Sequence, residues 1–222
     1  MARKPAVDDT IAVLGLGRFG GSLALELIRQ GWDVIGIDAD PRMVQAIADK
    51  LTHAAVADTT DEEALRQLGV HELTNVVVGI GTDVQASILT TSLLTDLAVP
   101  HILAKAISRQ HATILRRVGA HHVVLPEHEM GERVAHMVTG QILNFIQLDD
   151  DYVLAKTHAP AVVVDRTLAD ADLRNTHDVT VVAIKRPGLP FTHTTGDTVV
   201  YAGDVLIVVG DPASVQTFAS LT

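Results

Sequence analysis

Six short apolar runs, separated by segments of helical character, constrain the fold of this chain more than any other feature. The runs are rich in Val, Ile and Ala, as is usual for parallel strands that are buried on both faces. They lie at residues 11–15, 33–38, 53–58, 75–81, 101–106 and 121–125. Because strands that alternate with helices tend to pair in parallel, this pattern predicts an α/β fold with a Rossmann-type doubly wound sheet.

A glycine-rich sequence, GLGRFG at residues 15–20, connects the first run to the helix after it. In such a motif the first glycine permits a tight turn, the second lets the backbone approach a pyrophosphate, and the third allows close packing of helix on strand. The N-terminus of the following helix would direct unpaired N–H groups at the phosphates. The contacts predicted at this loop are Gly15, Leu16, Gly17, Arg18, Phe19 and Gly20.

An acidic residue, Asp38, ends the second run, 18 residues after Gly20. A carboxylate at this place usually binds the ribose hydroxyls of a dinucleotide, and its charge disfavours the 2′-phosphate of NADP. We include its neighbour Ala39 in the predicted site. The alternative is that the glycines only pack a turn and that Asp38 only caps a helix; the strand–loop–helix context favours the nucleotide site.

The same fingerprint suits NAD, ADP and ATP, because all three share adenosine and a diphosphate. Arg18 lies inside the glycine loop, and Lys105 ends the fifth run at the sheet edge where ligands bind. Two cations near the phosphates favour a ligand with more negative charge than a dinucleotide, such as ATP. The alternative is that both are solvated surface residues.

Further candidates follow the other runs at the same sheet edge. Asp58 and Thr59 come after the third run, where they would border the adenine, although Thr59 could equally cap a helix. The GIGTD stretch at residues 79–83, which includes Ile80 and Gly81, follows the fourth run and would line the cleft. Glu127 follows the sixth and is a candidate to approach the nucleotide or its metal cation.

Composition and charge exclude several classes of protein. The chain has no cysteine, which rules out a disulfide framework and a thiol nucleophile. Its formal net charge of −10 argues against nucleic acid as the main ligand. No apolar run approaches the ~18 residues that a membrane span needs, and the first residues lack a signal-peptide pattern. We expect a cytoplasmic protein whose membrane role, if it has one, is exercised through a partner.

The pattern changes after the sixth run. Apolar residues recur at helical spacing at Met130, Val134, Met137, Val138, Ile142 and Phe145. An acidic stretch at residues 147–152 then precedes short β-like runs at 152–156, 161–164, 179–185, 197–201 and 204–210. We also predict two helices here, one over residues 168–174 and one after Asp211 and Pro212. We therefore predict two domains: residues 8–146, which bind the nucleotide and end in this helix, and residues 151–222, a small α+β domain.

Several of these stretches together resemble the RCK (regulator of potassium conductance) family, in particular its KtrA/TrkA-like regulatory subunits. The resemblance extends from about residue 11 to residue 218. Its most specific elements are GLGRFGGS at 15–22, PEHEMG at 126–131 and AGDVLIVVG at 202–210, in this order. The stretches GIGTDVQASILTTSLL at 79–94 and LRNTHDVTVVAIKRPG at 173–188 also belong to it.

The resemblance implies a regulatory subunit rather than an enzyme. Such proteins form dimers that assemble into an octameric ring beneath a membrane potassium-translocating subunit, and the helix beginning near Met130 would be the crossover helix that pairs them. ATP and ADP compete for the Rossmann cleft and change the shape of the ring, and some relatives respond to NAD(H). Some also bind cyclic di-AMP through a segment that Leu173-Arg174 resembles, although residues 176–178 depart from that pattern.

The resemblance also suggests individual roles. Arg18 would reach the terminal phosphate near a dimer interface, Asp38 would bind the ribose, and Lys105 would be a cation of the cleft. Glu127 would approach the nucleotide, or a Mg²⁺ or other cation, from the neighbouring subunit. The rival hypothesis is an NAD-dependent dehydrogenase or an NAD(H) redox sensor. A dehydrogenase would need a general acid/base, and the histidines of residues 151–222 stand in no recognisable catalytic setting.

Overall fold

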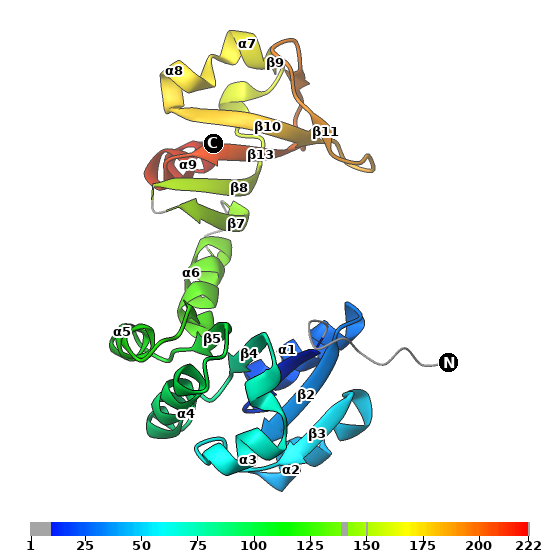
Figure 1. Ribbon diagram of the computed structural model, residues 1–222. Coiled ribbons are helices and arrows are strands. Elements are labelled where there is room, and N and C mark those ends of the chain that lie inside the picture. Colours follow the sequence, from blue (N-terminus) through cyan, green and yellow to red (C-terminus); the bar gives the residue numbers. More distant parts are fainter. Residues whose placement is uncertain (1–9, 139–141, 150, 222) are drawn as a thin grey trace. The chain divides into compact units, whose positions relative to one another are not determined.

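The computed structural model describes residues 10–138, 142–149 and 151–221 (Figure 1). Contacts between residues divide the chain into two compact units, Met1–Glu127 and His128–Thr222. Each unit has its own hydrophobic core and is described by itself. The predicted domain limits, 8–146 and 151–222, stay a prediction. In the described residues, no helix is both long enough and apolar enough to span a membrane.

The first unit contains the predicted six-stranded parallel sheet. Its strand order is β3-β2-β1-β4-β5-β6, so the order reverses between β1 and β4. The fold class predicted from the alternating runs is therefore confirmed. The strands are β1 (Thr10–Leu14), β2 (Asp33–Asp38), β3 (His53–Val56), β4 (Asn75–Val78), β5 (His101–Lys105) and β6 (His122–Val124).

Helices connect these strands, and most of them begin at a polar cap. The side chains of Asp40, Asp61, Asp83 and Ser108 accept hydrogen bonds from N–H groups in the first turns of α2, α3, α4 and α5. Helix α1 begins instead at Gly17, which has no side chain to offer. The helical segments between the strands are α1 (Arg18–Arg29), α2 (Pro41–Gln45), η2 (Ala48–Lys50), α3 (Glu62–Gln67), η3 (Val70–Glu72), α4 (Val84–Asp96) and α5 (Arg109–Arg117). Helix α6 (Pro126–Val138) follows β6, and its residues from His128 on belong to the second unit.

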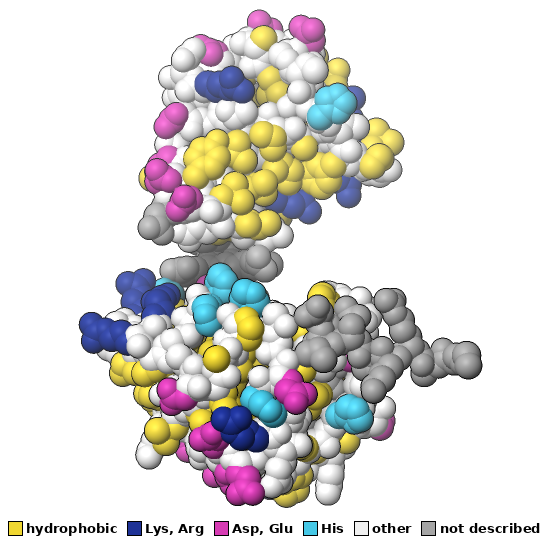
Figure 2. All heavy atoms as spheres, viewed as in Figure 1, with side chains coloured by type: hydrophobic (Ala, Val, Ile, Leu, Met, Phe, Trp, Pro, Cys, Tyr) yellow, Lys and Arg dark blue, Asp and Glu magenta, His cyan; other side chains and the backbone are white. Residues whose placement is uncertain are grey.

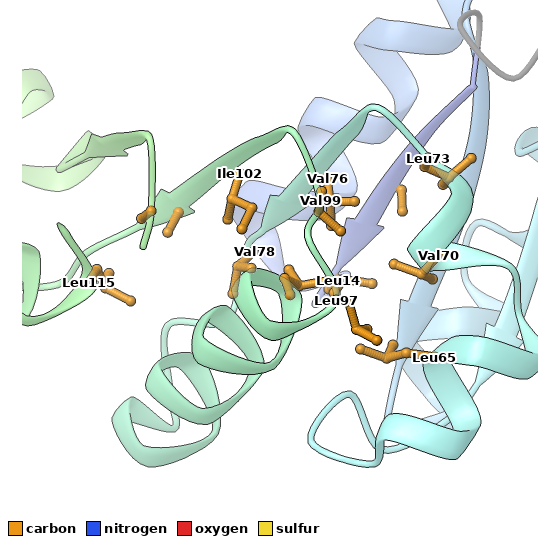
Figure 3. Packing of buried hydrophobic residues seen from close by; sticks show 14 of the residues in the cluster. Leu14, Leu65, Val70, Leu73, Val76, Val78, Leu97, Val99, Ile102 and Leu115 are labelled. Carbon is orange, nitrogen blue, oxygen red and sulfur yellow. The ribbon is translucent and has the colours of Figure 1, made fainter. Parts of the chain in front are cut away.

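The core of the first unit lies on both faces of the sheet, as its near-continuous apolar strands require. Val13 and Val34 belong to the cluster on one face, with Ala24 of α1. Leu14, Val78 and Ile102 belong to the larger cluster on the other face (Figure 3). The two layers fix where the strands end and so position the loops at the carboxyl edge.

The second unit is built on a five-stranded antiparallel sheet with the order β11-β10-β13-β8-β7. Helix α9 packs against β8, β13 and β10, and α8 packs against β10. A two-stranded ladder pairs β9 with β12. The elements are β7 (Ile142–Asp149), β8 (Tyr152–His158), η4 (Ala161–Val163), β9 (Arg166–Thr167), α7 (Leu168–Ala171), α8 (Leu173–His177), β10 (Val179–Lys185), β11 (Thr192–His193), β12 (Val199–Val200), β13 (Val205–Gly210) and α9 (Pro212–Ala219).

One face of this antiparallel sheet carries the core of the second unit, and the other remains exposed. Val153, Ala155 and Val208 are buried, whereas Ile146 and Tyr152 are each 44% exposed. Figure 2 shows hydrophobic side chains gathered over the sheet of this unit. The alternation is that of an antiparallel sheet covered on one side.

The helix predicted to reach Phe145 is wrong at its C-terminal end. Helix α6 ends at Val138, and Ile142–Asp149 is strand β7, which pairs with β8. A β-bulge explains the misleading spacing: the register shifts between Ile142 and Asn144. The extra residue lets Ile142 and Phe145 face the same core although they are three positions apart. Three-residue spacing in a bulged strand therefore imitated a helix.

Two smaller predictions are also corrected. Residues 161–164 do not form a strand; Ala161–Val163 is a 3-10 turn in which the N–H of Val163 donates to the carbonyl of Pro160, and Val163 is buried in the core. The helix predicted over residues 168–174 is broken at Asp172, whose φ of 46° lies in the left-handed region. Local turn bonds satisfy the backbone groups of the valine run at 161–164, so this run does not need to pair with a neighbouring strand.

Candidate functional site

A cleft of about 910 Å³ opens at the carboxyl edge of the parallel sheet. It receives residues at or after the ends of all six strands, β1 to β6, and it lies where the strand order reverses between β1 and β4. In open α/β sheets this switch point is where ligands bind, because the loops on its two sides lead away from each other. The topology alone therefore places the candidate site here.

The three glycines of the loop meet different constraints. Gly15 has a φ of 93°, and a Cβ added there would lie 2.9 Å from the backbone nitrogen of Ile80. A Cβ at Gly20 would collide with the carbonyl oxygen of Gly15. By contrast, a Cβ at Gly17 would meet no atom within 4 Å. Folding requires the first and third glycines, whereas Gly17 leaves space in the cleft at the N-terminus of α1.

Asp38 is already engaged by the backbone on two sides. Its Oδ2 accepts a hydrogen bond from the N–H of Leu16 at 2.6 Å, and its Oδ1 accepts one from the N–H of Asp40 at 2.8 Å. The carboxylate also lines the cleft, and a carboxylate has about four acceptor positions. Two acceptor positions therefore remain for a ligand hydroxyl.

Lys105 and Glu127 form an ion pair in the cleft, with 2.7 Å between Nζ and Oε1. Lys105 is only 8% exposed and lies over the ring of Phe19, 5.7 Å from its centroid. The hydrogen bond from Lys105 lowers the pKa of Glu127 below its ordinary value, and the nearby charge of Arg18 adds to this effect. The two cations and the carboxylate thus form one charged group in the cleft.

The residues after β3 are held by short-range hydrogen bonds. Asp58 accepts from both the hydroxyl and the N–H of Thr60, and these bonds lower the pKa of Asp58. Thr59 does not cap α3, which is capped by Asp61; its hydroxyl shares a hydrogen bond of 2.9 Å with Thr90 of α4. Asp58 therefore presents an ionised acceptor to the cleft.

The sequence predicted most of the residues that the structure brings together. All the predicted contacts line the cleft except Leu16 and Gly20, which support the loop from behind. Sequence reasoning missed seven further lining residues: Asp40, Met43, Thr60, Gln85, Ala86, Leu89 and Ile107. Met43 in α2, Leu89 in α4 and Ile107 after β5 are exposed apolar side chains. Their place in the segments that follow the predicted strands is the signal that could have identified them.

The described residues contain no cluster of three or more His, Asp or Glu side chains that could hold a metal ion. Glu127, predicted as a cation ligand, is paired with Lys105 within the same chain, and its contact with a metal cation stays a prediction. Its side chain is 64% exposed, so one oxygen is accessible from outside the unit.

Comparison with known families agrees with this architecture. The TrkA-N domain matches residues 11–126, and the TrkA-C domain matches residues 152–222. The chain belongs to the TrkA family of RCK-domain proteins. The resemblance inferred from the glycine loop and the later motifs is thereby confirmed. The matched TrkA-N segment contains every predicted site residue except Glu127, which follows its last residue.

Relatives of this TrkA-family chain share nearly its whole length. It is 37% identical over 208 residues to Ktr system potassium uptake protein C of Bacillus subtilis (strain 168), covering 93% of this chain and 94% of the relative. It is 35% identical over 212 residues to Ktr system potassium uptake protein A of the same organism, covering 95% and 96%.

Solved structures show the same fold at low sequence identity. The crystal structure of the GsuK RCK domain superposes with a TM-score of 0.64 at 15% identity, covering 100% of this chain and 50% of that one. The GsuK channel bound to NAD gives a TM-score of 0.54 at 22% identity, covering 98% and 39%. At these identities the likeness concerns the fold alone.

Proposed function

We propose that this chain is a cytoplasmic regulatory subunit that binds a nucleotide and thereby controls a membrane potassium-translocating partner. Both relatives described above are named as proteins of potassium uptake systems, and they match the chain over more than nine-tenths of its length. The cleft supplies a plausible input for regulation, because it combines a glycine loop, a free helix N-terminus and a group of charges. Such a subunit acts by binding and does not need a catalytic group.

The positive charges of the cleft are the observation that favours one nucleotide over another. Arg18 begins α1 at the glycine loop, and the buried Lys105 lines the same cleft, over the ring of Phe19. A triphosphate presents more negative charge to these cations than the diphosphate bridge of NAD(H) does. We therefore favour ATP and ADP as the regulatory pair. NAD(H) is the alternative ligand.

The regulatory mechanism would be a shift between conformations. A nucleotide that binds one conformation better than another moves the equilibrium by its differential affinity, typically about 1–3 kcal/mol for each site. We expect homodimers that assemble into an octameric ring, in which many such sites act together. The accessible oxygen of Glu127 would then approach a neighbouring subunit's nucleotide or a Mg²⁺ ion between subunits.

The second unit contains a separate hollow of about 370 Å³ that supports a second ligand. Leu173 and Arg174 line it, together with Thr194 and Thr195. Arg174 donates from Nε to the hydroxyl of Thr180, which leaves its terminal nitrogens as potential donors to a phosphate. Cyclic di-AMP is the candidate that the family resemblance suggests for this hollow.

Calorimetric titration of the purified chain with ATP, ADP and NADH tests the proposal, with light scattering to count subunits. Micromolar binding of ATP and ADP by an octamer is the expected result. Binding of NADH by a dimer that ignores ATP would favour the redox sensor. NAD(H)-linked turnover with a panel of alcohols and hydroxy acids would establish the dehydrogenase and overturn the regulatory proposal.

The variant Arg18→Ala sharpens this experiment. We expect the affinity for ATP to fall about tenfold, or about 1.4 kcal/mol, and the affinity for ADP to fall less. Arg29→Ala is the matched control, because Arg29 ends the same helix, α1, and pairs with Glu26 at the surface. Equal losses for ATP and ADP would remove Arg18 from the terminal phosphate.

A further inference from the structure

The carboxylate of Asp38 joins two loops that line the cleft and follow the neighbouring strands β1 and β2. One oxygen accepts from Leu16, inside the glycine loop between β1 and α1. The other accepts from Asp40, at the turn between β2 and α2. A residue whose only task was to bind a ribose would not need both of these bonds, and neither bond involves a ligand.

The backbone of β2 holds the same loop by a second bond. The N–H of Gly15 donates to the carbonyl of Ile37 at 2.7 Å, and the next N–H, that of Leu16, donates to Asp38 at 2.6 Å. Leu16 itself is 4% exposed, so its N–H has no access to bulk water as a substitute partner. Loss of the carboxylate would leave this buried donor without an acceptor.

We infer that Asp38 is a positioning residue for the phosphate-binding backbone, in addition to any contact with the ribose. By fixing Leu16, it fixes the peptide units of Gly17 and Arg18 that follow, at the uncapped N-terminus of α1. Those are the N–H groups that approach a phosphate in a loop of this kind. This inference rests on the proposed nucleotide site and assigns to Asp38 a role in phosphate affinity.

A positioning role for Asp38 predicts the opposite effect of Asp38→Asn on polyanion affinity from that expected from charge alone. Asp38→Asn removes a negative charge from the cleft, which by itself would strengthen the binding of any polyanion. An asparagine, however, presents one acceptor oxygen and one NH₂ group, so it cannot accept from both Leu16 and Asp40. We expect the lost loop geometry to weaken polyanion binding more than the lost charge strengthens it.

Inorganic tripolyphosphate is the decisive probe because it has phosphates but no ribose. We expect Asp38→Asn to weaken tripolyphosphate binding about tenfold, measured by calorimetry and by competition against ATP. The matched control is Asp40→Asn, which removes a charge from the same cleft and keeps an efficient helix cap for α2. Because its carboxylate does not contact the loop, this control should bind tripolyphosphate more tightly than the wild type.

Hydrogen exchange followed by mass spectrometry provides a second, local measurement. In Asp38→Asn, the amide of Leu16 should exchange faster while the amides of β4 and β5 keep their protection; general destabilisation would accelerate all of them. Unchanged or tighter tripolyphosphate binding by Asp38→Asn, with ATP binding reduced, would assign Asp38 to the ribose alone and overturn the inference. A wild-type chain that binds neither ATP nor tripolyphosphate would overturn the proposed function and this inference together.

Discussion

The two sheets of this molecule put their strand ends to different uses. In the parallel sheet all six carboxyl ends meet at one edge, so residues at or after all six of them gather in a single cleft of about 910 Å³. In the antiparallel sheet successive strands run in opposite directions, and its hollow is about 370 Å³. Strand direction therefore decides which unit can collect a large binding site.

Backbone conformation shows the same contrast. In the first unit, Gly15 adopts a left-handed φ of 93° at the glycine loop that faces the cleft. In the second unit, Asp165, Asp172 and Asp178 adopt left-handed conformations at the ends of short elements. Both units use left-handed residues to shape turns, as Gly69 and Ala98 do in the first, but among the described residues only the first has a left-handed glycine in the lining of its candidate ligand site. The two units should consequently respond differently to ligands and to substitutions.

The chain carries natural probes that distinguish the units. Its single tryptophan, Trp32, lies in the first unit, and its two tyrosines, Tyr152 and Tyr201, lie in the second. Tryptophan fluorescence therefore follows unfolding of the first unit, and the tyrosine near-ultraviolet signal follows the second. Each prediction below compares these two signals.

The largest effect is expected from Gly20→Ala. Its Cβ would collide with the carbonyl oxygen of Gly15, a backbone atom that can move only if the loop is rebuilt. We expect the first unit to lose about 3 kcal/mol of stability in urea titrations followed by Trp32, while the tyrosine signal is unchanged.

Two alanine substitutions serve as controls for this prediction. The Cβ that Gly17→Ala adds would meet no atom within 4 Å. We therefore expect the stability of the first unit to stay within about 0.5 kcal/mol of wild type and nucleotide binding to weaken instead. Gly196→Ala in the second unit makes only an ordinary contact with Ala169, at 3.5 Å. A Gly20→Ala protein as stable as Gly17→Ala would contradict the packing role assigned to the third glycine.

The sequence predicted the first unit far better than the second, for a physical reason. Parallel strands buried on both faces are continuous apolar runs, and the glycine loop has a spacing that few other structures share. In the second unit the signals are ambiguous: the bulge in β7 produces helical spacing, and the valines of 161–163 form a turn. Short-range sequence cannot distinguish these cases because neighbouring strands decide them.

Within the site, sequence reasoning identified residue types but not their partners. It placed Lys105 and Glu127 at one sheet edge without showing that they pair with each other at 2.7 Å. It assigned Asp38 to a ribose without the two backbone bonds that the carboxylate accepts. These contacts depend on how loops far apart in the chain pack together, and periodicity contains no information on that.

Ligand binding should separate the two units next most strongly. At a free ATP or ADP concentration of about 100 times the dissociation constant, the first unit should gain about 2.7 kcal/mol of stability. Trp32 should report this gain in thermal unfolding, while the tyrosines of the second unit should not. Equal shifts of both signals would mean that the units unfold together, and the absence of any shift would contradict the nucleotide site.

The pair of Lys105 and Glu127 should contribute less, about 1 kcal/mol, because Glu127 is largely exposed. Lys105 lowers the pKa of Glu127 from its ordinary value of 4.5, so the folded state favours the carboxylate. The contribution is therefore complete above pH 4.5 and is lost as the pH falls through the lowered pKa. We expect Glu127→Gln to destabilise the first unit at pH 7, and the difference from wild type to close in acid.

Glu62→Gln is the control for this prediction, since Glu62 forms an exposed ion pair with Arg66 on α3. Its effect should be smaller than that of Glu127→Gln, because neither partner is buried. A difference between wild type and Glu127→Gln that stays constant down to pH 3 would show that the ion pair does not stabilise the folded first unit.

The smallest effect concerns His111, on α5 in the core of the first unit. The side chain is 3% exposed, and its Nε2 has no hydrogen-bond partner among the described residues. Burial lowers its pKa from the ordinary value of 6.5, so the folded state binds this proton less readily than the unfolded state. The stability of the first unit should therefore fall as the pH drops below about 6.5, with no matching change from this group in the second unit.

His111→Asn tests this because the amide oxygen can replace Nδ1 as the acceptor for the N–H of Ile107 but does not titrate. The first unit of the variant should lose less stability than wild type between pH 7.5 and pH 5.5, as followed by Trp32. His122→Asn, at an exposed position on β6, should keep the wild-type pH dependence. If both variants retain it, the acid sensitivity of the first unit arises elsewhere, and the buried imidazole is tolerated in its charged form.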